Sequence, residues 1–570
     1  MYLTEEDFEK HLINIERSDY LPVDTEGSIN HPFSQTWGLS TSANSVPEYF
    51  AFNHAVGSNL PSSWLPRLRD IILNHPCLIF HNAKHDLRAL QNLGIDYQGK
   101  FYDTMLMAHM NDENIFSKEL DYLSKLFGGD PKRKSEEMNL LIKAYGWHIV
   151  PVDYIRPYGA NDAYITGELF YNLFDNFRAQ GFDGDLWDVE QKFIRLMSKI
   201  ENTGIPIDVR LSEQELERGL GIMAEIQSSL GFNPSSSTEL GNFLLEEMGL
   251  PVLKRSGKTD KPSFDKYVMQ AYDEILSLRE DKRATQILTY RGWQKTTSSN
   301  YRRYLEGLDP DGRLRCNYKL HGTHTCRMSC EDPNLQQIPR ESSNDWNGRL
   351  KEAFIAEEGF TAYEADFSQL ELRLGAAYGK EARLIEIFES DRDIFDEMAR
   401  DLGMSRFNTK TLNYTMQFGG GATRVKNVFG LESELAAKGI IKNYFKRYPG
   451  LAKASNLAKF RAEQNGFVKY WTGRRRHFAD VAEEARKAFN SVCQGGAFEI
   501  VKRRMIAVDE AGLNNEECRM DLQVHDSARF EIQNGKEHIY IPEIQNIMED
   551  VNSDFNFGVR FRVKIKKWGE

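Results

Sequence analysis

The sequence predicts a multidomain protein of α/β and α+β class, and three observations support this fold class. The chain has 570 residues, more than one hydrophobic core usually organises. Residues 1–185 alternate short apolar strands with helical segments, as in an α/β domain, and residues 186–306 carry apolar side chains at the three- and four-residue intervals of helices. The rest of the chain mixes strand and helix patterns, which is typical of an α+β arrangement.

The composition excludes a membrane-spanning protein. The chain is 41% hydrophobic and 27% charged, and it has no apolar run long enough to cross a bilayer. The acidic N-terminus, from Met1 to Asp7, lacks the features of a secretion signal, so we expect an intracellular, cytoplasmic protein. The net charge of −12 does not indicate a nucleic-acid binder, but the position of basic residues matters more than their total. Basic clusters occur at 474–477, 502–504 and 564–567.

Six cysteines in a chain of this length fit a reducing compartment. Five potential zinc ligands lie close in sequence, but they match no paired Cys-x-x-Cys site. They are Cys316, His321, His324, Cys326 and Cys330. We expect reduced, unligated thiols, and the pattern does not decide whether this cluster binds anything.

In the first 185 residues, acids recur where predicted strands end and helices begin. Side chains two apart on a strand, or four apart on a helix, share one face. The residues are Asp24 and Glu26 at the end of a strand, Asp86 and Asp103 at two helix starts, and Asp162 four residues after Tyr158. Asp103 is expected to cap its helix.

Two further acids follow apolar strands in the second half of the chain. The alternating segment 360–365 predicts a strand, and Asp366 stands where that strand ends and a helix begins. The segment 521–526 is a second such strand and ends in Asp526. Neighbouring strands could bring these carboxylates together to hold two divalent cations for phosphoryl transfer. Two unrelated surface acids would fit the strand patterns equally well.

Three motifs decide between these alternatives. Asp-Phe-Ser-Gln-Leu-Glu-Leu-Arg at 366–373 resembles motif A of the family-A DNA polymerases, the bacterial DNA polymerase I group. The segment 406–419 resembles their motif B, and Val-His-Asp at 524–526 resembles motif C. The acids of the first 185 residues resemble the three motifs of the DEDDy 3′–5′ exonucleases.

The resemblance implies an RNase-H-like 3′–5′ exonuclease domain followed by a right-hand polymerase. The implied domains are the exonuclease at 1–185, the thumb at 186–306, the first part of the palm with motif A at 307–383, the fingers with motif B at 384–465, and the second part of the palm with motif C at 466–570.

For the exonuclease, the resemblance implies four metal-holding carboxylates and a tyrosine that orients the attacking water. These are Asp24, Glu26, Asp86 and Asp162, with Tyr158. Asp103 is expected to be structural. His85 stands where the family usually has an aromatic residue, and we expect it not to touch the metal-holding set.

For the polymerase, the resemblance implies that Asp366, Asp526 and the backbone carbonyl of Phe367 hold two Mg²⁺ ions, or Mn²⁺ in their place. The implied nucleotide-binding residues are Arg406 and Lys410 on the phosphates, Tyr414 beside the sugar, Phe418 near the base, Glu371 as a steric gate against a ribose 2′-hydroxyl, and Gln369. The implied DNA contacts are Arg327, Asn334, Gln336, Arg486, Asn490, Gln494 and His525.

Two departures from the family pattern fall at the polymerase site. Phe395 stands where the family usually has a phosphate-binding histidine, a contact that Arg392 or Arg424 could replace. Ser527 stands where the family normally has a glutamate, directly after Asp526. We expect the loss of that third acid to weaken metal affinity or to change metal preference.

The function implied is a template-directed DNA polymerase with a proofreading exonuclease. Its partners would be primer–template DNA, dNTPs and other replisome proteins, and we expect a monomer without membrane contact. The chain shows no preceding 5′-nuclease domain and so resembles a compact phage replicative polymerase, which would work in the host cytoplasm. The rival hypotheses are a stand-alone exonuclease with a degenerate binding module and a non-catalytic primer–template-binding protein.

Overall fold

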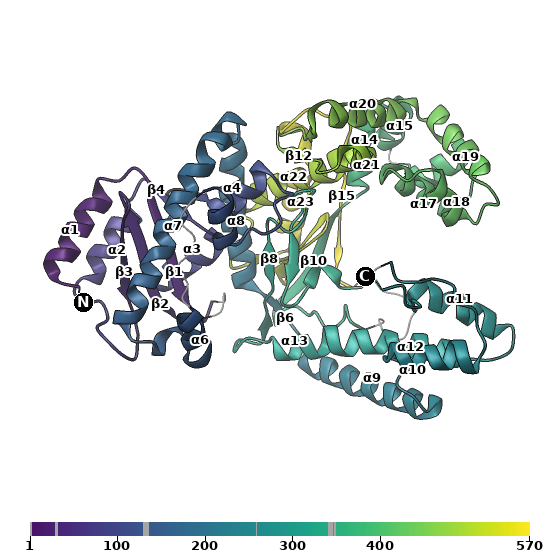
Figure 1. The fold of residues 1–570 in the computed structure, drawn as a ribbon. Helices are drawn as coiled ribbons and strands as arrows, with labels where there is room; N and C mark the ends of the chain where they lie inside the picture. The colour runs from purple at the N-terminus through teal and green to yellow at the C-terminus, as the bar shows by residue number, and fades with distance from the viewer. Residues whose placement is uncertain are drawn as a thin grey trace. The chain divides into compact units, whose positions relative to one another are not determined.

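The computed structural model describes residues 3–28, 32–128, 136–257, 259–339, 346, 349–390 and 392–569 (Figure 1). The chain divides into two compact units. The first unit contains residues 1–203, 318–329 and 363–566, and the second contains residues 204–317, 330–362 and 567–570.

The N-terminal part of the first unit is built on a five-stranded sheet with the order β3-β2-β1-β4-β5. Strands β1, β2 and β3 are antiparallel, whereas β4 runs parallel to β1 and to β5. Every side chain of β4 is buried, as expected for a parallel strand covered on both faces. The strands are β1 (Leu21–Gly27), β2 (Thr36–Ala43), β3 (Val46–Ala51), β4 (Cys77–Phe80) and β5 (Lys100–Asp103).

Helices cover this sheet and bury its apolar side chains. The long helix α7 packs across β1, β2 and β3, and α3 packs on β1, β2 and β4. The α/β class predicted for this part of the chain is confirmed. The helices are α1 (Glu5–Glu16), α2 (Leu65–Leu73), α3 (Ala83–Asn92), α4 (Thr104–Asn111), α5 (Leu120–Leu126), α6 (Glu136–Tyr145), α7 (Val152–Ala179) and α8 (Asp185–Thr203), with a short 3₁₀ turn η1 (Trp147–Ile149).

The other half of the first unit contains a four-stranded sheet with the order β13-β14-β10-β15. Helix α22 packs against α14, α20 and α23. The strands are β10 (Phe360–Phe367), β13 (Cys518–Val524), β14 (Ser527–Gln533) and β15 (Val563–Lys567), and the helices are α14 (Leu370–Gly379), α20 (Pro449–Asn465), α22 (Ala488–Glu510) and α23 (Glu537–Glu549).

Between α14 and α20 the chain forms a group of five helices. They are α15 (Ala382–Glu389), α16 (Ile394–Leu402), α17 (Arg406–Gln417), α18 (Ala422–Phe429) and α19 (Glu434–Arg447). Shorter elements of the chain are β8 (Asn317–Lys319), β9 (Ser329–Glu331), η4 (Leu335–Gln337), β11 (Phe467–Lys469), β12 (Arg475–His477), α21 (Val481–Glu484), η6 (Ala485–Lys487) and η7 (Val551–Ser553).

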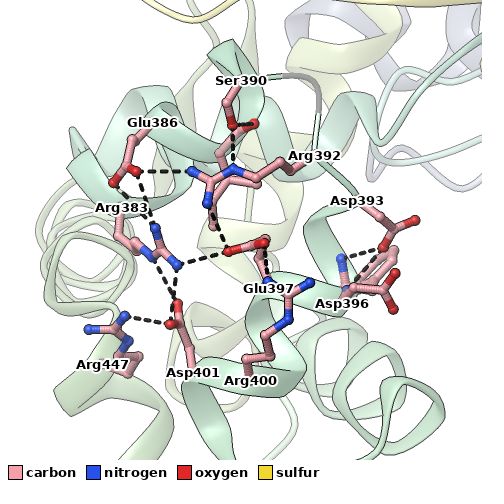
Figure 2. Close-up of polar contacts among 12 residues, drawn as sticks. Arg383, Glu386, Ser390, Arg392, Asp393, Asp396, Glu397, Arg400, Asp401 and Arg447 are labelled. Atoms are coloured by element: carbon pink, nitrogen blue, oxygen red, sulfur yellow. Dashed lines mark hydrogen bonds and ion pairs between the residues drawn. The ribbon is translucent and has the colours of Figure 1, made fainter.

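An ion-pair network fixes α16 within this group (Figure 2). Two poorly exposed acids of α16, Glu397 and Asp401, lie 3.0 Å from nitrogens of Arg383 on α15. Arg392 pairs with Glu397 at 3.1 Å, and Arg447 on α19 pairs with Asp401 at 2.5 Å. Because the two acids are poorly exposed, their pairs are screened less than surface pairs, and they hold α16 against α15 and α19.

The second unit is mainly helical, as predicted for most of residues 186–306. Its apolar core lies between α10, η2, α11 and α12, and side chains of Asp208, Ser236 and Asp265 cap three helix N-termini. Strand β6 (Ile205–Pro206) pairs with β7 (Arg313–Leu314). The helices are α9 (Val209–Leu230), α10 (Ser237–Gly241), the π-helical turn η2 (Asn242–Glu247), α11 (Lys266–Ser277), α12 (Arg283–Lys295), the π-helical turn η3 (Thr296–Tyr301) and α13 (Arg302–Glu306). In the described parts of the chain, no helix has the length and apolar character needed to span a membrane.

A buried ionic network joins the two halves of the first unit. Glu190 on α8 accepts hydrogen bonds from Arg474 and from Lys502 on α22. Glu499, also on α22, lies 3.3 Å from the Lys502 ammonium and 3.5 Å from the Arg474 guanidinium. All four side chains are at most 2% exposed, so water cannot solvate their charges, and each charge depends on its partners in the network.

We therefore expect Arg474→Met to destabilise the first unit by about 3 kcal/mol, because the change leaves buried carboxylates short of a cation. Thermal unfolding followed by circular dichroism measures the effect.

The matched control is Lys192→Met. Lys192 pairs with Glu510 at 2.7 Å, and both side chains are 53% exposed, so its loss should cost less than about 1 kcal/mol. Equal destabilisation by the two substitutions would contradict this account of the network.

Candidate active sites

Three carboxylates gather at the end of β1 in the N-terminal part. Asp24 and Glu26 are two residues apart on β1, and Asp162 comes from α7. One ligand oxygen from each lies within 4.8 Å of the others. Carboxylate oxygens are hard ligands, so this group has the chemistry that holds a divalent cation such as Mg²⁺.

The fourth predicted acid, Asp86, is tied to the strand segment between the first two. It is buried in the first turn of α3, and its Oδ1 accepts hydrogen bonds from the backbone N–H of Thr25 at 2.9 Å and from the Thr25 hydroxyl at 2.8 Å. Its neighbour His85 was expected not to touch this set. That expectation was wrong, because His85 Nδ1 lies 3.8 Å from Asp86 Oδ1 and 3.4 Å from the Thr25 hydroxyl. The first turn of α3 points both side chains at Thr25.

Asp103, the last residue of β5, bonds to the starts of two helices at this end of the sheet. Its carboxylate caps α4 by accepting from the N–H groups of Met105 and Leu106, as predicted, and it also accepts from the N–H groups of Asn82 and Ala83. Burial raises the pKa of Asp103 to about 6, although the four hydrogen bonds act in the opposite direction. Because Asp103 binds the chain at the start of α3, it fixes the helix that carries Asp86.

Tyr158 lies one turn before Asp162 on α7 and packs against the Trp147 ring, with ring centroids 5.6 Å apart. Burial, followed by the negative charges of Asp162 and Glu26, raises the pKa of Tyr158. The hydroxyl therefore stays protonated at neutral pH and can hydrogen-bond to a water beside the carboxylates.

The two acids of the second half lie on neighbouring strands. Asp366 is the last residue but one of β10, and α14 begins four residues later. The backbone N–H of Phe367 donates to the carbonyl oxygen of Asp526 at 3.2 Å. This bond brings the backbone that carries Asp366 against the backbone that carries Asp526.

The segment around Asp526 differs from the predicted strand 521–526. Strand β13 ends at Val524, and His525 and Asp526 form a two-residue turn into β14, with Val524 paired to Ser527. His525 takes the left-handed conformation that such a tight turn requires, with φ of 52°. Asp526 therefore stands at a hairpin tip beside the end of β10, and not in a strand.

A third acid that sequence analysis missed lies at this place. The Ser527 hydroxyl donates to Glu364 Oε1 at 3.1 Å and lies 2.9 Å from the Val524 carbonyl oxygen. Glu364 is two residues before Asp366 on β10, so their side chains leave the same face of the strand. The alternation of the predicted strand could have revealed Glu364, because it places residues 364 and 366 on one face.

Glu371, the predicted steric gate, is held by two donors. Arg327 Nη2 lies 2.5 Å from Glu371 Oε1 and 3.0 Å from Asp526 Oδ1, so one guanidinium bridges the two acids. Gln417 Nε2 donates to Glu371 Oε2 at 3.0 Å. Burial raises the pKa of Glu371, while the Arg327 charge acts against that shift. Gln417 gave no signal in sequence, because only the fold brings the end of α17 to α14.

Helix α17 carries Arg406, Lys410 and Tyr414 at four-residue spacing, and Phe418 is the residue that ends it. The rings of Tyr414 and Phe418 stack with centroids 6.3 Å apart. Of this set, Arg406, Lys410 and Phe418 are exposed and Tyr414 is half-buried, so the face stays open to a ligand.

Phe395 and two acids of the α16 N-terminus face this helix. The Phe395 ring lies 5.8 Å from the Arg406 guanidinium and 5.8 Å from the Lys410 ammonium, within range of cation–π attraction. Arg406 also pairs with Asp393 at 2.9 Å and with Asp396 at 3.1 Å. Arg392, considered above as a substitute phosphate contact, is instead committed to Glu386 and Glu397 (Figure 2).

Of the predicted DNA contacts in the first unit, Asn490 and Gln494 lie on α22. Arg486 lies in the 3₁₀ turn η6 directly before that helix, where its Nε donates to the Glu483 carbonyl oxygen. The carbonyl oxygen of Arg486 approaches Gly419 so closely that a Cβ there would lie 2.5 Å from it. This close approach, together with φ of 71°, explains why a glycine follows α17.

The remaining predicted contacts are placed by local structure. Gln369 takes a left-handed conformation directly before α14, with φ of 50°. In the second unit, Asn334 caps η4 by accepting from the N–H of Gln336. Their roles toward nucleotide and DNA stay predictions.

The cysteines form no disulfide within the described residues. Groups of three or more possible metal ligands whose atoms lie within 4.8 Å occur at two places in these residues. Besides the β1 cluster, the second contains Asp112, Glu113 and His477, and Glu113 is already engaged there by Arg476 and His477. Neither group includes a member of the cysteine–histidine cluster considered for zinc.

Comparison with solved structures supports the fold. The chain is similar to the polymerase domain of Pol1 from M. smegmatis, solved in complex with DNA primer–template and dNTP. The TM-score is 0.84 at 22% sequence identity, with 98% of this chain and 97% of the other covered.

Curated relatives are bacterial enzymes. DNA polymerase I of Pseudomonas aeruginosa is 28% identical over 564 residues, covering 92% of this chain and 61% of that protein. The thermostable DNA polymerase I of Thermus aquaticus is 31% identical over 425 residues, covering 68% of this chain and 49% of that protein. The chain thus spans about half to three fifths of the length of these relatives.

Two family models match the chain. The 3′–5′ exonuclease family matches residues 1–177, and DNA polymerase family A matches residues 210–570. The resemblance drawn from the sequence motifs is therefore confirmed, and the chain belongs to DNA polymerase family A, with a 3′–5′ exonuclease domain before the polymerase domain.

Proposed function

We propose that this protein is a template-directed DNA polymerase that adds deoxynucleotides to a primer 3′-hydroxyl and proofreads with its 3′–5′ exonuclease. The observation that carries the proposal is the backbone bond from Phe367 to Asp526, which unites the motif A and motif C acids. The family matches over both parts of the chain support it.

At the polymerase centre, Asp366, Asp526 and the Phe367 carbonyl would hold two Mg²⁺ or Mn²⁺ ions. When bound, such ions activate the attacking hydroxyl and neutralise the leaving group. Glu371, fixed by Arg327 and Gln417, would stand where a ribose 2′-hydroxyl would go, so its position sets the choice of sugar.

The nucleotide would lie along α17. Arg406 and Lys410 offer the positive charge for the triphosphate, and Tyr414 and Phe418 offer rings for the sugar and base. Because Arg406 pairs with Asp393 and Asp396, a bound triphosphate has to displace these carboxylates from the guanidinium.

At the exonuclease centre, Asp24, Glu26, Asp86 and Asp162 would hold the cations. Tyr158, whose hydroxyl stays protonated, would orient the attacking water. The hydrolysed strand would be a primer end that failed to pair.

Primer–template DNA is the proposed macromolecular partner. The proposed contacts are Arg327, Asn334, Gln336, Arg486, Asn490, Gln494 and His525. Copying and proofreading in one chain suit DNA replication, and phage replication in the host cytoplasm, with other replisome proteins, is the setting we propose.

Extension of a labelled primer tests both centres at once. We expect Asp366→Ala to lower extension with dNTPs by at least about a thousandfold, because several kcal/mol of transition-state stabilisation are lost. Shortening of the primer without dNTPs should survive in this variant.

Asp24→Ala is the matched counterpart and should give the reverse pattern. A wild type that only shortens the primer would favour the stand-alone exonuclease. A wild type that binds the primer–template but neither extends nor shortens it would favour the non-catalytic binding protein.

The choice between ribonucleotides and deoxynucleotides tests the proposed role of Glu371 as a steric gate. Glu371→Ala should raise the kcat/KM for a ribonucleotide, relative to that for the matching deoxynucleotide, by about 100-fold, because the excluded volume beside C2′ is opened.

Gln417→Met keeps the side-chain length but removes the hydrogen bond to Glu371, and it should shift the same ratio by about tenfold. Loss of activity without a change in the ratio in either variant would show that the carboxylate does not select the sugar.

A further inference from the structure

Ser527 and Glu364 form a pair across neighbouring strands of the four-stranded sheet. Ser527 is buried, at 4% exposure, and stands where the family resemblance expects a glutamate. Its hydroxyl hydrogen-bonds to the Glu364 carboxylate at 3.1 Å. The position expected to carry an acid therefore contacts an acid that belongs to another strand.

Glu364 is connected to each of the two proposed metal-holding acids, Asp366 and Asp526. It shares one face of β10 with Asp366, two residues later. Its hydrogen-bond partner Ser527 directly follows Asp526, whose carbonyl oxygen is bonded to the N–H of Phe367. Glu364 and Asp366 thus leave the same face of β10, and the hairpin that carries Asp526 is bonded to β10 both through the Ser527 hydroxyl and through the Phe367 N–H.

We propose that Glu364 supplies the third carboxylate of the polymerase metal centre, in place of the acid that Ser527 lacks. This inference rests on the proposed polymerase function. The acid stands on β10 and not in the hairpin, and the serine is the donor that holds it. A third negative charge raises the affinity of such a centre for divalent cations, because affinity follows the charge and rigidity of the ligand set.

The oxygen chemistry fits this role. A glutamate carboxylate is a hard ligand of the kind Mg²⁺ prefers, either directly or through a bound water. Glu364 is half-buried, so its charge is screened less than that of a surface acid. Oε1 of Glu364 accepts a hydrogen bond from the Ser527 hydroxyl, and this bond restricts the orientation of the carboxylate.

Glu364→Gln isolates the charge. Glutamine keeps the oxygen that accepts from Ser527 and the size of the side chain, so folding is preserved while the negative charge is lost. Mn²⁺ binding is measured by electron paramagnetic resonance of the free ion, on the full chain with Asp24 and Asp162 replaced by asparagine to remove the exonuclease ions. We expect Mn²⁺ affinity to fall by about tenfold or more.

The reciprocal exchange is the sharper test. Glu364→Ser with Ser527→Glu returns the acid to the hairpin, and it should restore Mn²⁺ affinity to within about twofold of the parent, whereas Glu364→Ser alone should not. Glu516→Gln, which neutralises an exposed acid before β13, is the control for general charge and should leave affinity unchanged.

The Mg²⁺ concentration for half-maximal primer extension is the second measurement. It should rise in Glu364→Gln by a similar factor and return in the double variant. Unchanged Mn²⁺ affinity in a folded Glu364→Gln protein, with primer extension intact, would overturn the role of Glu364 but leave the polymerase proposal standing. Absence of extension by the wild type, with Mn²⁺ binding that depends on Glu364, would instead overturn the polymerase proposal and keep the metal site.

Discussion

The register between β10 and the β13–β14 hairpin is the constraint on which the proposed polymerase centre depends. The Phe367 N–H bonds to the Asp526 carbonyl, and the Ser368 N–H, one residue later, bonds to the Arg562 carbonyl before β15. Side chains alternate along a strand, so a slip of one residue would turn Glu364 and Asp366 to the opposite face. The hairpin turn is equally constrained, because His525 must take the left-handed conformation for Asp526 to stand at its tip.

The face of α17 proposed to bind the nucleotide combines a fixed support with an exposed surface. Helix α16 is anchored to α15 and α19 through ion pairs of two poorly exposed acids, and it presents Phe395 and two acids to α17. The cations of α17 are thereby held in place without being buried. An exposed guanidinium paired with carboxylates can exchange partners at little cost, since exposed ion pairs contribute only about 0–1 kcal/mol.

The sequence predicted those parts of the sites that follow from local pattern. Strand alternation and helix spacing placed Asp24, Glu26, Asp162 and Asp366 at strand ends and on helix faces, and Asp103 was recognised as a cap because capping involves neighbouring residues. The contacts of Gln417 with Glu371 and of Ser527 with Glu364 join segments far apart in the chain. No periodicity reports such contacts, because they depend on which elements the fold brings together. The error over His85 has the same origin in part, since its contact with the Thr25 hydroxyl joins residues 60 positions apart.

Electrostatics explains why the acids need their partners. The protein carries a net charge of −12, and both centres concentrate carboxylates where a polyanion would have to approach. Carboxylates this close repel one another unless a cation stands between them. Beside the four-stranded sheet, the Arg327 guanidinium supplies part of that positive charge, because it bridges Glu371 and Asp526. While its N–H groups are bonded to two carboxylates, the guanidinium has fewer donors left for a hydrogen bond to DNA. If Arg327 moves to the DNA as proposed, Asp526 loses this positive charge, and the proposed DNA binding and cation binding at this centre would then be linked through one side chain.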